Sequence, residues 1–328
     1  MKILKIVRLV LLSFGCVLFH SIDHCSAQVL LKRQITLMGS IFQITIVDQD
    51  TISANKNIDL TIAEISRIEH LISEWKSDTQ ISEVNRNAGI KPVKVDREVF
   101  DLTKRALSYA QMSNGAFDIS IAAMDKIWKF DGSMSEMPEE SAVKQSVEKV
   151  GFQYVVLDSL NSTIYLQRAG MKIGFGSIGK GYAADKGRAL MQALGVKAGI
   201  VNASGDMSTW GEQPSKKAWV IGISNPFKRH KIIKKLKMKE SAVATSGSYE
   251  KFAEIDGKHY SHIINPKTGY PSTGLTSVTI YGASAEFANA LSTSIMVLGE
   301  YEGLKLLKQF PDYKGLLITD EGKLRTGK

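Results

Sequence analysis

Apolar residues recur at helical spacing in several separate segments of the chain. In segment 57–72, isoleucines lie three or four residues apart at Ile58, Ile62, Ile65, Ile68 and Ile72. This spacing places them on one face of a helix, so the segment is predicted to pack on a core. The same spacing predicts helices over 100–110, 183–194 and 285–298. Gly195 follows the helix 183–194 directly, where a left-handed residue would end it.

Short apolar or alternating runs predict the strands. They cover 35–47, which Gly39 interrupts, and 155–167, 171–175, 198–201, 219–223, 242–247 and 277–281. We expect 155–167 and 171–175 to pair. Segment 126–138 shows neither pattern and is predicted to be an irregular surface excursion.

A glycine-rich turn, GFGSIGKG, lies between the apolar run 171–175 and the helix 183–194. Strand, glycine turn, helix and strand in succession favour backbone N–H groups and a helix N-terminus that face an anion. The spacing matches neither a Walker loop nor a GxGxxG fingerprint. A tight connection without a ligand is the alternative.

Candidate catalytic or ligand-binding side chains occur in further segments. On the polar face of the helix 285–298, Asn289, Ser292 and Thr293 are three and four residues apart, so their oxygens converge. Such oxygens suit a hard cation such as Mg²⁺, although an ordinary polar face has the same spacing. His262 lies among hydroxyl groups in 260–269, and Trp75 lies in a polar loop, where it packs or covers a flat ring system.

The N-terminus has the pattern of a secretory signal. Basic residues precede an apolar run over 9–19, and Ala27 ends a short stretch of small residues. We predict a signal peptide over 1–27 and one domain over 28–328. A buried helix, a membrane anchor or a lipoprotein signal at Cys16 are the alternatives. Cleavage after Ala27 would remove both cysteines, Cys16 and Cys25, and with them any disulfide or thiol-based metal site.

The composition of the whole chain, 44% hydrophobic and 23% charged, is that of an ordinary globular protein. Removal of the signal would lower the net charge from +9 to about +7. Much of the surplus lies in KRHKIIKKLKMK, over 228–239. A solvated strand edge explains it, and steering of an anionic ligand or contact with anionic lipid is the alternative. No nucleic-acid motif accompanies it, so nucleic acid is not an expected partner.

Eight motifs, in order along the chain, resemble those of the ApbE-type FAD:protein FMN transferases. They are MGSIFQITIV, SEWKSDTQISEVNRNAG, GAFDIS, GFGSIGKGYAAD, VNASGD, AVATSGSYEKF, HIINPKTGYP and ANALSTSIMVLG. The resemblance extends over about residues 35–300. It implies an α+β protein with the flavin transferase fold, in which mixed sheets pack against helices.

The resemblance also implies a reaction and a place. The family uses FAD as substrate with Mg²⁺, moves FMN to a Thr or Ser hydroxyl of an acceptor protein and leaves AMP. The expected acceptor is a membrane redox subunit. We expect an exported, periplasmic protein, either free or attached to the periplasmic side of the inner membrane.

Site residues follow from the resemblance by position. The FAD site would be lined by Met38, Trp75, Ala116, Phe117, Asp118, Gly174, Lys180 and Ile263. The metal would be held by the backbone carbonyl of Ser177 and by Asn289, Ser292 and Thr293. His262 would be the catalytic residue that accepts a proton from the incoming hydroxyl.

This chain departs from the family pattern at three positions. Asn289 and Asn265 stand where Asp is usual or commoner, and Gly174 stands where Asp is frequent. An amide keeps one oxygen ligand but removes a charge, so we expect weaker Mg²⁺ binding than in members with Asp. Gly174 is expected to widen the pocket. The alternatives to transfer are a FAD pyrophosphatase that yields FMN and AMP, and a non-catalytic periplasmic FAD-binding protein.

Overall fold

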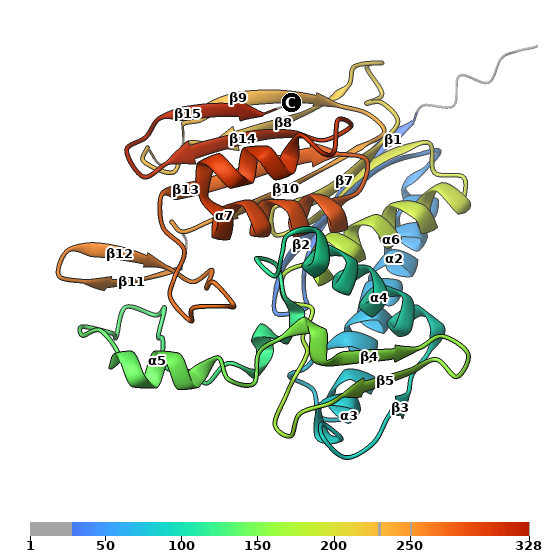
Figure 1. Cartoon of the computed structure of the whole chain (residues 1–328). Helices are drawn as coiled ribbons and strands as arrows, with labels where there is room; N and C mark the ends of the chain where they lie inside the picture. The colour runs from blue at the N-terminus through green and yellow to red at the C-terminus, as the bar shows by residue number, and fades with distance from the viewer. Residues whose placement is uncertain (1–27, 229–230, 250, 328) are drawn as a thin grey trace, which may run out of the picture.

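The fold is organised around an antiparallel sheet of eight strands in a computed structural model that describes residues 28–228, 231–249 and 251–327 (Figure 1). The signal predicted over 1–27 and both cysteines lie outside these residues. In order across the sheet, the strands are β1 (Val29–Leu37), β2 (Ser40–Asp48), β6 (Ala198–Ala203), β7 (Asp206–Trp210), β10 (Ser241–Gly247), β13 (Leu275–Gly282), β14 (Lys314–Thr319) and β15 (Leu324–Gly327).

The long helices α2 (Thr51–Ile72), α6 (Gly179–Ala193) and α7 (Ala285–Leu307) cover one face of this sheet. A fourth long helix, α4 (Arg97–Met112), contacts α7, and the helices α3 (Gln80–Arg86) and α5 (Glu140–Ser146) are short. The helices predicted from periodicity are confirmed. The segment predicted as 57–72 begins earlier because Asp50 accepts a hydrogen bond from the Ser53 N–H at 2.8 Å and caps the helix. Gly195 has the expected left-handed conformation, with a φ of 82°.

The opposite face of the sheet carries a separate hairpin of β8 (Trp219–Ser224) and β9 (Ile232–Met238). Ile221 and Leu236 from this hairpin pack on Val243 and Leu316 of the sheet. These sheet residues alternate with Ala242 and Leu317, which face the helices. The lysine-rich segment is thus mostly the strand β9, in agreement with its interpretation as a strand edge.

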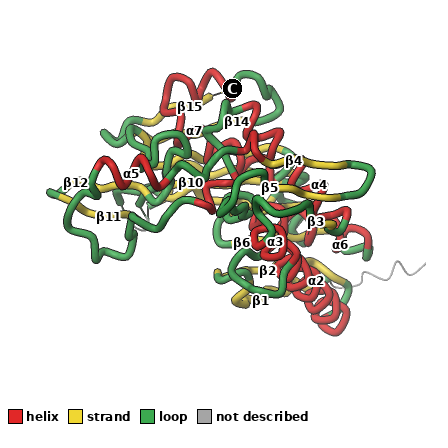
Figure 2. The backbone as a smooth tube through the Cα atoms, turned by 60° about the horizontal axis from the view of Figure 1, so that its bottom comes forward, coloured by secondary structure: helices red, strands yellow, loops and turns green. Residues whose placement is uncertain are grey.

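Smaller elements complete the chain. They are the sheet of β3 (Val93–Lys94), β4 (Val155–Asp158) and β5 (Thr163–Leu166), the hairpin of β11 (Phe252–Ile255) and β12 (Lys258–Ser261), and the 3-10 turns η1 (Ile119–Ala123) and η2 (Phe152–Tyr154). Figure 2 shows α5 beside β11 and β12, and Trp128 and Val143 pack there on Ile255. As predicted, 126–138 has no regular structure.

Three strand predictions need correction. The run 35–47 is not one strand but belongs to the hairpin β1–β2, which turns through Met38 and Gly39 with φ of 49° and 66°. The run 171–175 is not a strand. Asn85 satisfies the backbone of Ile173, with its amide oxygen 2.8 Å from the N–H and its amide nitrogen 3.0 Å from the carbonyl. The expected partner, 155–167, instead folds back on itself as β4 and β5.

Candidate active site

A cavity of about 1110 Å³ lies where the β1–β2 turn, the N-terminus of α6, the strands β7 and β10, and α7 converge. Of the residues predicted for the site, it is lined by Met38, Trp75, Ala116, Phe117, Asp118, Ser177, Lys180, His262, Ile263, Asn289 and Thr293. Segments distant in the sequence therefore form one chamber. Gly174 and Ser292 do not line it.

The glycine turn leads into the N-terminus of α6. Ile178 is the N-cap and offers no side-chain hydrogen bond to the helix, and Lys180 projects from the first turn into the cavity lining. Gly181 lies against the start of α7, because a Cβ there would come within 2.7 Å of the Ala285 carbonyl carbon. The turn therefore combines a cation and a helix N-terminus, which suits an anionic ligand.

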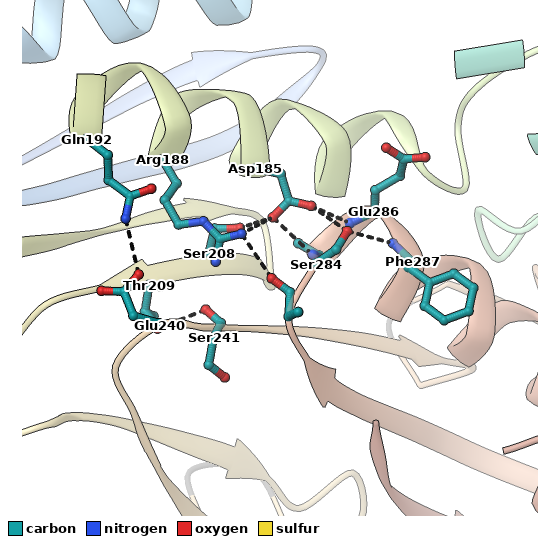
Figure 3. Close-up of polar contacts among 12 residues, drawn as sticks. Asp185, Arg188, Gln192, Ser208, Thr209, Glu240, Ser241, Ser284, Glu286 and Phe287 are labelled. Carbon is teal, nitrogen blue, oxygen red and sulfur yellow. Dashed lines mark hydrogen bonds and ion pairs between the residues drawn. The ribbon is translucent and has the colours of Figure 1, made fainter. Parts of the chain in front are cut away.

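Asp185, on α6, fixes the beginning of α7 (Figure 3). Its carboxylate accepts hydrogen bonds from the N–H groups of Ala285 at 3.0 Å and Glu286 at 3.1 Å, and from the hydroxyls of Ser284, at 2.7 Å, and Ser208. A negative charge also interacts favourably with a helix N-terminus. Because Asn289 lies one turn further along α7, this contact sets the position of the predicted metal ligands.

The polar face of α7 forms a hydrogen-bonded group. The Thr293 hydroxyl donates to Asn289 Oδ1 at 3.4 Å, and the Asn289 amide nitrogen donates to Asp206 on β7. Ser292 is fully buried, donates to the Asn289 carbonyl at 3.0 Å and lies 2.8 Å from the Ser246 hydroxyl. Asn289 and Thr293 therefore face the cavity, while Ser292 lies behind them.

Asp206 is a residue that the analysis of the sequence did not single out, although it ends the motif VNASGD. It lines the cavity and is 4% exposed. Burial raises the pKa of its carboxyl to about 7, although the nearby Lys180 ammonium and the hydrogen bond from Asn289 act to lower it. The motif alone gives no signal that this Asp lies beside Asn289, because 83 residues separate the two positions.

The three consecutive residues 116–118 form one wall. Burial raises the pKa of the Asp118 carboxyl, and hydrogen bonds from Ser120 and Phe152 oppose that effect. One oxygen accepts from the N–H of Ser120 at 2.8 Å and its hydroxyl at 2.7 Å, and the other accepts from the Phe152 N–H at 2.8 Å. The side chain thus holds the loop, and we expect the backbone of this wall to contact a ligand.

Gly174 does not widen the cavity, contrary to the expectation from the sequence. A Cβ at this position would lie 2.7 Å from Glu74 Oε1, so the Glu74 carboxyl fills the space. Burial raises the pKa of Glu74, opposed by backbone hydrogen bonds from its own N–H and that of Phe175. Glu74 is a second lining residue that the sequence did not reveal.

The contact between Gly174 and Glu74 predicts how substitutions at these positions change the free energy of unfolding. Gly174→Asp should lower the free energy of unfolding by about 1–3 kcal/mol, because the new side chain overlaps the Glu74 carboxyl. Glu74→Ala/Gly174→Asp should recover most of that loss. Urea titrations followed by circular dichroism measure both. Gly176→Ala is the matched control, since its Cβ would meet nothing within 4 Å, and an equal loss in the double variant would contradict the contact.

His262 lies at the rim of the cavity and is exposed. Its Nδ1 is 3.1 Å from the carbonyl oxygen of Lys251. Because a carbonyl only accepts, Nδ1 carries the hydrogen, and Nε2 is the basic nitrogen of the neutral ring. His262 also lines an adjoining cavity of about 790 Å³, together with Glu74, Trp75 and Ile264. The imidazole therefore lies at the junction of two cavities.

The oxygen atoms on this face fit a magnesium ion by their chemistry. Asn289, Thr293 and the Ser177 backbone offer hard neutral oxygens, and Asp206 adds a carboxylate beside them. Among the described residues, no cluster of three or more His, Cys, Asp or Glu could hold a metal.

A family model described as the ApbE family matches residues 38–317. A FAD:protein FMN transferase of Klebsiella pneumoniae is 30% identical over 285 residues, which are 86% of this chain and 87% of that protein. One of Treponema pallidum is 33% identical over 272 residues, 78% of this chain and 75% of that protein.

Solved structures agree with these matches. The ApbE protein of Thermotoga maritima superimposes with a TM-score of 0.83 and 29% identity, covering 92% of this chain and 97% of that one. The apo flavinyl transferase ApbE of Pseudomonas stutzeri gives a TM-score of 0.81 at 25% identity, over 92% of this chain and 95% of that one. The fold is that of the flavin transferases, and this chain belongs to the ApbE family. The resemblance and the fold class inferred from the motifs are both confirmed.

Proposed function

We propose that this protein transfers FMN from FAD to a Thr or Ser hydroxyl of an acceptor protein, in a Mg²⁺-dependent reaction that releases AMP. Its family is one of flavin transferases. The observation that carries the proposal for this chain is the single cavity that joins Lys180, the N-terminus of α6, the oxygens of α7 and His262.

Phosphoryl transfer depends mainly on the positioning of groups and the neutralisation of charge. Lys180 and the backbone at the start of α6 would bind the pyrophosphate of FAD. Trp75, which is 76% exposed, offers a flat surface for an aromatic ring of the substrate. Met38, Phe117 and Ile263 supply apolar walls, and the backbone of 116–118 would orient the rings.

Ser177, Asn289 and Thr293 would hold the Mg²⁺, with Ser292 supporting them from behind. The ion would neutralise charge on the phosphate oxygens when bound. His262 would accept the proton of the acceptor hydroxyl through Nε2, and its place at the junction of the cavities lets a protein segment approach from outside.

One incubation distinguishes transfer from its alternatives. The protein is mixed with FAD, Mg²⁺ and a redox-protein domain encoded beside its gene, and the products are separated on a denaturing gel and by liquid chromatography. Flavin fluorescence on the acceptor band, with AMP in solution, is the expected result. Free FMN with no labelled band would instead support a FAD pyrophosphatase, and unchanged FAD would support a binding protein.

Export to the periplasm, with a membrane redox subunit as acceptor, also belongs to this proposal. It is supported by the signal pattern of 1–27 and by the lysines of β9, which suit anionic lipid. No helix among the described residues is long and apolar enough to span a bilayer. Sequencing of the N-terminus of the exported protein tests the signal, and a first residue far from Gln28 would contradict it.

Trp75→Ala should weaken FAD binding by about tenfold or more, because an aromatic stack on a base contributes about 1–3 kcal/mol. Trp75→Tyr should retain most of the affinity. The ring is exposed, so neither change should alter the free energy of unfolding by more than about 0.5 kcal/mol. Quenching of flavin fluorescence measures the affinity. Tyr301→Ala removes a comparably exposed aromatic ring from outside the cavity and is the control.

A further inference from the structure

The contact with Asp206 orients the side-chain amide of Asn289. Its Nδ2 donates to a carboxylate oxygen of Asp206, and both residues are more than nine-tenths buried. In this contact the carboxylate is the acceptor and the amide NH₂ group is the donor, so the NH₂ group faces Asp206. Oδ1 then lies on the side of Thr293, whose hydroxyl donates to it at 3.4 Å.

This orientation decides whether Asn289 can bind a cation. The amide oxygen is a metal ligand, and the amide NH₂ is a donor that a cation repels. Without a pure acceptor behind it, the amide could rotate and present its nitrogen to the cavity. The Asp206 carboxylate, as an acceptor, favours the rotamer that keeps the NH₂ group on its own side and Oδ1 on the side of Thr293.

Asp206 also contributes charge to the same place. It lines the cavity with Asn289, Thr293 and Lys180, and the backbone N–H of Thr245 donates to it, which fixes its position in β7. Asn289 and Thr293 are neutral, and the Asp206 carboxylate contacts Asn289 directly. Buried carboxylates behind metal ligands commonly change metal affinity by about 10–100-fold.

We propose that Asp206 is the positioning carboxylate of the metal site in this chain: it turns the Asn289 oxygen toward the cavity and supplies the negative charge that the amide lacks. The proposal rests on the proposed metal dependence of the site. Asp206 would partly compensate for the weaker Mg²⁺ binding expected from Asn289, because it carries a negative charge next to the neutral ligand.

A double-mutant cycle tests this role. Binding of Mn²⁺ alone to the full chain is measured by electron paramagnetic resonance in the native protein, Asp206→Asn, Asn289→Asp and the double variant. Asp206→Asn should weaken binding at least tenfold in the native background, since it loses the charge and frees the amide to rotate. With Asp at position 289 the ligand has no amide to orient and only the charge is lost, so the same change should cost at least about threefold less than in the native background.

Other outcomes would overturn the proposal. Native protein that does not bind Mn²⁺, an Asp206→Asn variant that binds as tightly as native, or equal losses in both backgrounds would each do so. Equal losses would show that Asp206 does not orient the Asn289 amide, and melting curves of each variant check independently for an effect on the fold. Asp320→Asn, at a carboxylate that accepts hydrogen bonds outside the cavity, is the matched control. A cycle with the expected pattern in a protein that fails to transfer flavin would leave this proposal standing and reject the function alone.

Discussion

Replacing His262 by asparagine should lower the rate of flavin transfer about 10²- to 10⁴-fold, the usual contribution of a positioned general base. FAD affinity should change little, because the imidazole lies at the rim and not among the groups that would bind the pyrophosphate. The loss should lie in the transfer step itself, so it should persist at saturating FAD and Mg²⁺. Single-turnover transfer at one pH, with FAD affinity measured separately, provides the data.

His259→Asn is the matched control for this experiment. His259 lies in the neighbouring hairpin, where it stacks on Phe252 with ring centroids 4.0 Å apart, and it does not line either cavity. It should transfer flavin at the native rate. A His262→Asn variant with native activity would show that another group accepts the proton, while the assignment of the cavity would remain.

Local sequence signals predicted the four long helices because apolar residues recur at helical spacing in each, whereas the short helices α3 and α5 were not predicted. In α2, Ile58, Ile65, Ile68 and Ile72 are buried as their spacing indicates, and Ile62 is partly buried. Strand 171–175 failed because an apolar run contains no information on its hydrogen-bond partner, which is the Asn85 side chain from a distant segment. A strand needs both buried apolar side chains and hydrogen-bond partners for its backbone. A periodic sequence pattern indicates only the burial.

In the candidate site, too, local sequence indicates some features, while others depend on contacts between distant segments. Most residues named from the resemblance line the cavity, although Gly174 and Ser292 do not. The resemblance did not reveal Glu74 or Asp206, although both lie within its motifs, because their roles depend on which side chain faces which across the fold. Glu74 occupies the space left by Gly174, and Asp206 binds Asn289. Both are carboxylates beside positions at which the family commonly has Asp, a relation that appears only once the chain is folded.

Removal of the carboxylate that joins α6 to α7 should have the largest effect on stability. Asp185→Ala should lower the free energy of unfolding by about 3 kcal/mol or more, because it leaves two N–H groups and two hydroxyls without their acceptor (Figure 3). Urea titration followed by circular dichroism measures the loss. Asp101→Ala, which removes a surface carboxylate paired with Arg97, should cost less than about 1 kcal/mol and is the control.

The same substitution tests whether this contact serves the site as well as the fold. Asp185→Asn keeps an acceptor of the same shape, so it should lose less stability than the alanine variant, but it removes the charge at the start of α7. If the position of α7 determines the placement of Asn289 and Thr293, Mn²⁺ affinity should fall in the order native, Asp185→Asn, Asp185→Ala under conditions in which all three are folded. Equal Mn²⁺ affinity in the three proteins would mean that the metal ligands are positioned by their own neighbours, with Asp206 foremost, and not by the beginning of the helix.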